Sequence, residues 1–106
     1  MIAEGKIPSS KVYEDENILA FNDINPQAPI HVVVIPKAHI SCLDDINESN
    51  ADIAAKICAK IPEIAKKAGV VNGYRLVSNC GADACQSVKH LHFHILGGTQ
   101  LADKMA

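Results

Sequence analysis

The chain has 106 residues, of which 48% are hydrophobic and 21% charged, and its formal net charge is −2 at pH 7. These values are typical of a single globular domain, spanning residues 1–106, that can bury a core. They exclude a strongly basic surface for nucleic acid, and no apolar run is long enough to cross a membrane. The first ten residues lack the pattern of a signal peptide, so we expect a cytoplasmic location, with the nucleus as the alternative.

The four cysteines are Cys42, Cys58, Cys80 and Cys85, and they include no Cys-x-x-Cys pair. In an intracellular chain of this size, cysteines are usually reduced thiols rather than disulfides. We therefore expect free thiols, with Cys58 buried on a helix as a small apolar side chain.

Short stretches rich in β-branched and aromatic residues predict strands in the first third of the chain. Lys11 to Tyr13 and Asn17 to Asn22 flank an acidic turn, which predicts a hairpin. Two prolines between Asp23 and Pro29 indicate an ordered loop. His31 to Pro36 then predicts a strand whose continuous apolar character is typical of a central position, covered on both faces.

The hydrophobic period changes after residue 45. Isoleucine and alanine recur at spacings of three and four from about Asn50 to Ala68, which predicts a helix with one buried stripe. Asn47 or Ser49 is a candidate cap for the start of this helix, and Gly69 follows its end. Pro62 lacks an amide hydrogen, so we expect a kink or a brief break there.

Two more strands are predicted in the last third of the chain. The first spans Gly73 to Asn79, and a loop of mainly small residues, Asn79 to Ser87, follows it. The second spans Lys89 to Gly98 and contains three histidines that alternate with apolar residues. The order strand, strand, strand, helix, strand, strand predicts an α+β domain with an antiparallel five-stranded sheet and one main helix.

Three histidines, His90, His92 and His94, stand at every second position of the last predicted strand. In a strand they share one face, and the apolar residues between them fill the core face. The outer two would lie about 13 Å apart, so one zinc ion cannot readily bind all three, although two could share an ion with other ligands. Nucleophilic catalysis fits the row better, because a neutral imidazole can form a covalent intermediate. His92 is the natural nucleophile, since it alone has a histidine on each side.

The loop before the histidines suits an anionic ligand. Asn79 and Ser87 bracket a run that contains Gly81 and several small residues, so backbone amides can approach a phosphate closely. The Ser87 hydroxyl adds a hydrogen-bond donor. Most such loops are simple turns, and the signal gains weight only beside the histidines.

The stretch from His90 to Leu96 is similar to the His-φ-His-φ-His-φ-φ signature of the histidine triad family, in which φ is apolar. The following Gly97-Gly98 resembles the Hint branch of nucleotide-binding phosphoramidases. Phe21 to Pro29, His31 to His39 and Gln86 to Val88 resemble Hint segments in the same order. The resemblance implies a homodimer whose two five-stranded sheets join into one of ten strands. It also implies a purine nucleoside monophosphate ligand and hydrolysis of the phosphorus–nitrogen bond of nucleoside 5′-phosphoramidates.

The same resemblance implies a role for individual residues. His92 would attack the α-phosphorus and form a nucleotidylated histidine, and Ser87 would assist the leaving amine. His31 would orient or tune the nucleophile, and His90 would be a supporting residue. The implied nucleotide contacts are Asp23 to the ribose hydroxyls, Ile24 to the nucleoside, and Asn79, Cys85, Gln86, Ser87, His92 and His94.

Three features depart from the Hint pattern. Many relatives bind zinc through a Cys-x-x-Cys pair and the residues that match His39 and His90; this chain lacks the pair, so we expect no metal and no cofactor. Ala84 and Cys85 stand where Hint proteins usually have glycines, which bears on how closely the loop wraps a phosphate. No Trp-bearing tail follows Gly97-Gly98, so leaving-group selectivity is expected to differ.

Two other functions in this family remain open. A nucleotide-binding or scaffold protein with little catalysis would bind AMP or GMP with negligible turnover. A dinucleoside polyphosphate hydrolase is the other, and the Gly97-Gly98 ending argues against it. A zinc-binding protein outside the family is the last alternative.

Overall fold

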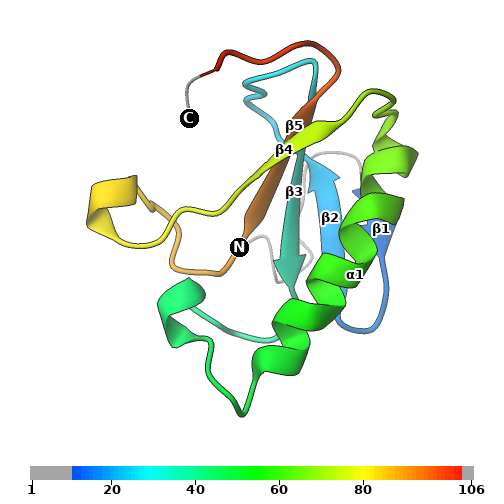
Figure 1. Ribbon diagram of the computed structural model, residues 1–106. Helices are drawn as coiled ribbons and strands as arrows, with labels where there is room; N and C mark the ends of the chain where they lie inside the picture. Colours follow the sequence, from blue (N-terminus) through cyan, green and yellow to red (C-terminus); the bar gives the residue numbers. More distant parts are fainter. Residues whose placement is uncertain (1–10, 104–106) are drawn as a thin grey trace.

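The computed structural model describes residues 11–103. Within this range, a five-stranded antiparallel sheet carries one long helix across one of its faces (Figure 1). The strands are ordered β1-β2-β3-β5-β4, and the α+β fold predicted from the sequence is confirmed. The elements are β1 (Lys11–Glu14), β2 (Ile18–Asn22), β3 (Ile30–Pro36), the 3-10 helix η2 (Leu43–Asp45), α1 (Ala51–Ala68), β4 (Tyr74–Val77), the 3-10 helix η3 (Ala82–Ala84) and β5 (Phe93–Gly97).

Strand β3 lies at the centre of the sheet and is covered on both faces, as its apolar sequence predicts. Val32 and Val34 are fully buried in the core that includes α1, whereas Val33 and Ile35 belong to a second buried cluster. Because side chains alternate along a strand, these two pairs point to opposite faces of the sheet. His94 of β5 is paired with Val33, so the register places it on the face away from α1.

The helix α1 packs on the sheet through the stripe that the sequence predicts. Its buried side chains are Ile57, Ile61, Ile64 and Ala65, at spacings of three and four residues. Gly69 ends the helix with a φ of 102°, a left-handed conformation that glycine adopts at little cost. No helix within residues 11–103 is long and apolar enough to cross a membrane.

The start and the middle of α1 differ from the expectation. The residue at the cap position is Asn50 rather than Asn47 or Ser49. The side-chain oxygen of Asn47 is not available as a cap, because it accepts hydrogen bonds from the amide and hydroxyl of Ser49. Of the predicted kink or break at Pro62, the break is wrong, since the helix continues through this residue. Buried isoleucines on both sides of Pro62 anchor the helix there and offset the missing hydrogen bond.

Strand β5 is shorter than predicted, because it begins at Phe93. His90 and His92 therefore lie in the segment that leads into the strand. The amide of Leu91 donates a 2.6 Å hydrogen bond to the carbonyl of Ile40, which replaces a sheet contact at this point. Leu91 and Phe93 are nevertheless buried in the core, so the predicted alternation of core and histidine side chains is retained.

The four cysteines are free thiols, as expected, but Cys58 is exposed rather than buried. Ile57 occupies the buried position on this turn of α1. Successive helical residues are rotated by about 100°, so the side chain after Ile57 points away from the sheet.

Candidate functional site

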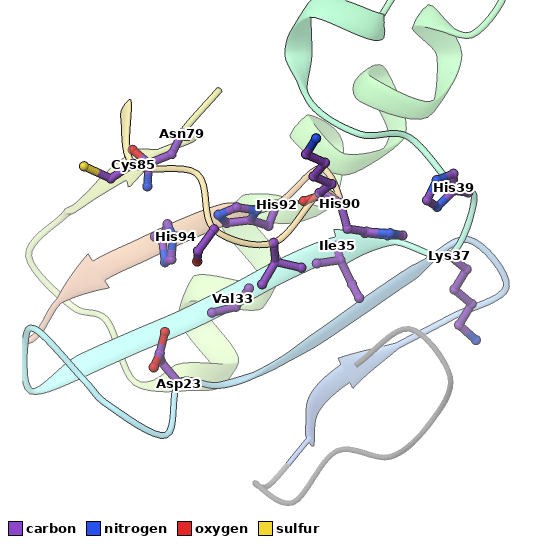
Figure 2. Close-up of a pocket in the computed structure, with 13 residues that line it drawn as sticks. Asp23, Val33, Ile35, Lys37, His39, Asn79, Cys85, His90, His92 and His94 are labelled. Atoms are coloured by element: carbon purple, nitrogen blue, oxygen red, sulfur yellow. Dashed lines mark hydrogen bonds between the residues drawn. The ribbon is translucent and has the colours of Figure 1, made fainter. Parts of the chain in front are cut away.

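A cavity of about 510 Å³ lies on the sheet face opposite α1 (Figure 2). This volume is within the range of small-molecule binding sites. Val33 and Ile35 of β3 give the cavity an apolar wall, and titratable side chains surround it. The lining residues are Asp23, Val33, Ile35, Lys37, His39, Asn79, Cys85, Ser87, Val88, Lys89, His90, His92 and His94.

The cavity brings together most of the residues that the sequence predicts for the site, from three separate parts of the chain. His31 is close by but lies behind His94, with 6% of its surface exposed. Ile24 does not line the cavity and is 75% exposed. Gln86 does not line it either, because its side chain bonds within the loop. The predicted residues that do line it are Asp23, Asn79, Cys85, Ser87, His90, His92 and His94.

A chain of hydrogen bonds fixes the protonation of His31 and His94. The amide of Gln27 donates to Nδ1 of His31 over 3.0 Å, so a neutral His31 carries its proton on Nε2. That Nε2 lies 2.8 Å from Nδ1 of His94 and donates to it. His94 must then carry its own proton on Nε2, the nitrogen that remains free. The chain thus presents His94 to the cavity as a hydrogen-bond donor.

His92 has the opposite tautomer. Its Nδ1 lies 2.8 Å from the backbone carbonyl of His90, and a carbonyl can only accept, so Nδ1 carries the proton. In the neutral ring, Nε2 is then an unprotonated lone pair. The Ser78 hydroxyl donates to the carbonyl of His92 over 2.8 Å and holds the backbone that carries the ring. The rings of His92 and His94 meet edge to face, with centroids 4.9 Å apart.

His90 lies at the other side of His92 and has a structural contact. Its Nε2 donates to the backbone carbonyl of Pro36 over 2.9 Å, at the end of β3. The ring of His39 stands 5.7 Å away from it, measured between centroids. His90 therefore ties the segment before β5 to the end of β3.

Asp23, His31 and His94 have ligand atoms within 4.8 Å of one another, a spacing that a metal ion could use. The hydrogen bond between His31 and His94 already occupies the two nitrogens concerned. The carboxylate of Asp23 lies 3.5 Å from the donating Nε2 of His31. We therefore interpret the two histidines as a hydrogen-bonded relay with Asp23 beside it, because the facing histidine nitrogens already bond to each other.

The loop between β4 and β5 is held by Gln86. Its Oε1 accepts from the amide of Gly81, and its Nε2 donates to the carbonyls of Ser41 and Val88. This use of the side chain differs from the nucleotide contact that the resemblance implies. Gln86 instead fixes the loop that carries Asn79 and Ser87 beside the cavity.

Cys85 is in the left-handed region, with φ of 60° and ψ of 35°. This is a backbone conformation that glycine adopts at little cost. An L side chain there costs about 1–2 kcal/mol relative to the right-handed helical region.

Cys85→Gly should raise the free energy of unfolding by about 0.5–1 kcal/mol, because it relieves this strain while adding some entropy to the unfolded chain. Urea unfolding followed by circular dichroism measures it. Ala84→Gly is the matched control: Ala84 lies in η3, without a positive φ, so that glycine should destabilise the protein. Equal effects of the two glycines would contradict the strain argument.

Burial sets the protonation of the two relay histidines. Burial lowers the pKa of His94, and the neighbouring His92 and His31 lower it further against the opposing charge of Asp23. Burial also lowers the pKa of His31, again opposed by Asp23. Both rings are therefore neutral in the folded chain at pH 7, as the hydrogen-bond chain requires.

This protonation makes stability depend on pH. With both pKa values lowered on folding, the unfolded chain binds more protons below its ordinary histidine value of 6.5. The free energy of unfolding should therefore fall as the pH drops through about 6.5. Above that pH the two histidines make their full contribution to stability. Urea midpoints from about pH 5 to pH 8 measure this, and His31→Phe should show a weaker dependence. The same dependence in both proteins would contradict the assignment.

Several site residues were missed by sequence reasoning. Val33 and Ile35 are cavity residues because β3 alternates, which the strand pattern could have shown. Ser78 acts through a hydrogen bond to His92, which is distant in the sequence, and the Gln27 amide through a hydrogen bond to His31 across a loop. No sequence motif marks either residue.

Comparison with known proteins agrees with this geometry. The model of the HIT domain family matches residues 4–101. The crystal structure of a HIT family hydrolase from Legionella pneumophila Philadelphia 1 superposes with a TM-score of 0.91 at 43% identity, covering 99% of this chain and 95% of that one. The 14 kDa zinc-binding protein of Zea mays is 45% identical over 102 residues, 94% of this chain and 80% of the relative. The adenylylsulfatase HINT1 of Arabidopsis thaliana is 40% identical over 102 residues, 94% of this chain and 69% of the relative. The chain therefore belongs to the HIT domain family.

Proposed function

We propose that the protein hydrolyses the phosphorus–nitrogen bond of purine nucleoside 5′-phosphoramidates through a nucleotidyl-histidine intermediate. The observation that carries the proposal is the bond from His92 Nδ1 to the His90 carbonyl, which leaves Nε2 as a lone pair beside the cavity. A fixed neutral imidazole is a competent nucleophile near pH 7. The fold that the chain shares with a HIT family hydrolase supports hydrolysis as the reaction class.

In the first step, Nε2 of His92 attacks the α-phosphorus and the phosphorus–nitrogen bond breaks. The departing amine takes a proton that the Ser87 hydroxyl can pass on from solvent, and His92 carries the nucleotidyl group. His94 donates its Nε2 hydrogen to a non-bridging oxygen, where negative charge accumulates in the transition state. Water then attacks the same phosphorus, which releases the nucleoside monophosphate and restores His92.

The nucleoside would lie along the apolar wall of the cavity. Val33 and Ile35 give that wall, and Asp23 lies at the end of the cavity where it can accept from ribose hydroxyls (Figure 2). Asn79 and Ser87 supply donors for the phosphate. Ile24 is exposed on the loop after Asp23, and in the proposal it lies against the bound nucleoside.

A homodimer is part of the proposal. Strand β4 is at one edge of the sheet, and its Tyr74 and Leu76 are each 41% exposed. An edge strand with exposed apolar side chains can pair with a second copy and so join two sheets. Size-exclusion chromatography with light scattering measures the resulting mass.

The proposed chemistry needs no metal, because the nucleophile and the donors are side chains of the chain. His39 and His90 remain near each other, but His90 bonds to Pro36 and no Cys-x-x-Cys pair is present in the sequence. We propose that this pair holds no zinc, in contrast to the relative from Zea mays that is named as zinc-binding.

A substrate panel tests the proposed activity. Adenosine 5′-phosphoramidate, adenylyl sulfate and diadenosine tetraphosphate are each incubated with the protein, and AMP release is followed by chromatography. Rapid release from the phosphoramidate supports the proposal. Faster release from adenylyl sulfate would favour the reaction named for the Arabidopsis relative, with the same nucleophile and a different leaving group. AMP binding without turnover of any substrate would favour the scaffold alternative and overturn the proposal.

A further inference from the structure

A second cluster of ligand-type side chains lies outside the proposed catalytic machinery. Cys42 directly precedes η2, Asp44 lies within η2, and Cys80 follows β4. One ligand atom from each, two sulfurs and a carboxylate oxygen, lies within 4.8 Å of the other two. The three residues come from two segments that are distant in sequence, so the fold itself assembles the group.

The chemistry of this group matches a thiophilic divalent cation. With zinc–sulfur bonds of about 2.3 Å, two sulfurs of a tetrahedral site lie about 3.8 Å apart, so the two sulfurs need to approach by at most about 1 Å. Cys42 and Cys80 are partly buried, while Asp44 is exposed and can turn toward an ion. Thiolate sulfur selects zinc over magnesium or calcium.

Ligation by a thiol displaces its proton, and the resulting thiolates would repel each other and the Asp44 carboxylate. A cation bound among the three groups offsets that repulsion.

We propose that Cys42, Asp44 and Cys80 form a Zn²⁺ site with two thiolate ligands and one carboxylate ligand. Binding releases two thiol protons, and a molecule from solvent completes the tetrahedron. This site is separate from the His39–His90 pair. The sequence prediction of no metal was based on that pair, and a zinc ion at Cys42, Asp44 and Cys80 would differ from it.

The proposed ion would join two segments that flank the cavity. Cys80 directly follows Asn79, which lines the cavity, and Ser41 directly precedes Cys42. Gln86 already links these segments by donating to the carbonyl of Ser41 over 2.7 Å. Zn²⁺ would add a second link and hold the phosphate loop against the segment after β3, so it should raise the thermal midpoint of unfolding.

Titration with Co²⁺ under a non-thiol reductant tests the site, because cobalt–thiolate ligation gives a charge-transfer absorption that histidine or carboxylate ligation does not. We expect one equivalent of Co²⁺ to give this band and one equivalent of Zn²⁺ to abolish it. Cys42→Ser and Cys80→Ser should lose the band, and Asp44→Asn, a change at an exposed side chain, should weaken binding at least about tenfold. Cys58→Ser and Cys85→Ser are matched controls that should keep it.

Three results would overturn the proposal. One is the absence of a thiolate band in the folded protein, as judged by circular dichroism. Another is a band that Cys58→Ser or Cys85→Ser removes while Cys42→Ser does not. The third is a Cys42–Cys80 disulfide that persists under the reductant, shown by thiol counting, since that bond would consume both sulfur ligands.

Discussion

His92→Ala should lower the turnover of adenosine 5′-phosphoramidate by about 10⁴-fold or more, the loss typical of removing a nucleophile. The side chain is partly buried, and its one hydrogen bond runs to the adjacent backbone, so the fold should survive its removal. AMP should still bind, because the apolar wall and the phosphate donors remain. Steady-state kinetics and calorimetric titration with AMP measure the two effects separately.

A companion variant makes the test specific to the imidazole. In His92→Gly, free imidazole can enter the space left by the side chain and accept the nucleotidyl group in its place. Added imidazole should therefore restore part of the turnover of His92→Gly. It should not change the turnover of the control variant Cys58→Ser, whose substitution is at an exposed position of α1. Turnover of His92→Ala equal to that of the wild type would contradict covalent catalysis by this residue.

His31→Phe should lower turnover by about 10–100-fold, although His31 does not line the cavity. Phenylalanine has a similar shape but cannot donate to Nδ1 of His94, so His94 is free to carry its proton there instead of on Nε2. The donor to the phosphate is then lost in part of the molecules. The amide of Gln27, an exposed residue, also loses its acceptor, which should cost about 0.5–1.5 kcal/mol of stability.

The conservative variant His31→Gln separates this positioning role from packing. A glutamine can accept from Gln27 through its oxygen and donate to His94 through its nitrogen, so it should recover more turnover than phenylalanine does. A purely structural role would instead give losses that follow thermal stability. Equal turnover of the two variants at matched stability would contradict the relay.

The fold was largely predictable from local patterns. The apolar run at 31–36 indicated a central strand, and the register of that strand sets which histidines reach the cavity. Leu91 and Phe93 alternate with the histidines in the sequence. This alternation indicated that the histidines share one side, because burial of Leu91 and Phe93 in the core directs the side chains between them outward. The resemblance to Hint proteins supplied the place of His31, which spacing alone does not reveal.

Features that depend on tertiary contacts could not be predicted. The late start of β5, at Phe93, follows from the bond between Leu91 and Ile40, which are far apart in the chain. The loop role of Gln86 depends on a carbonyl 45 residues away, at Ser41. Likewise, no sequence spacing brings Cys42 and Cys80 together, because the segments after β3 and after β4 meet only in the folded chain.

The covalent intermediate is the central claim, and mass spectrometry tests it most directly. Wild-type protein is mixed with a slow adenosine phosphoramidate, quenched in alkali, where phosphohistidine is more stable than in acid, and digested for peptide mapping. The account predicts one adenylyl group on the peptide that contains His92, on the wild type and absent from His92→Ala. Multiple turnovers with no adduct at any quench time, together with inversion of configuration at a chiral phosphorus, would show direct attack by water and contradict it.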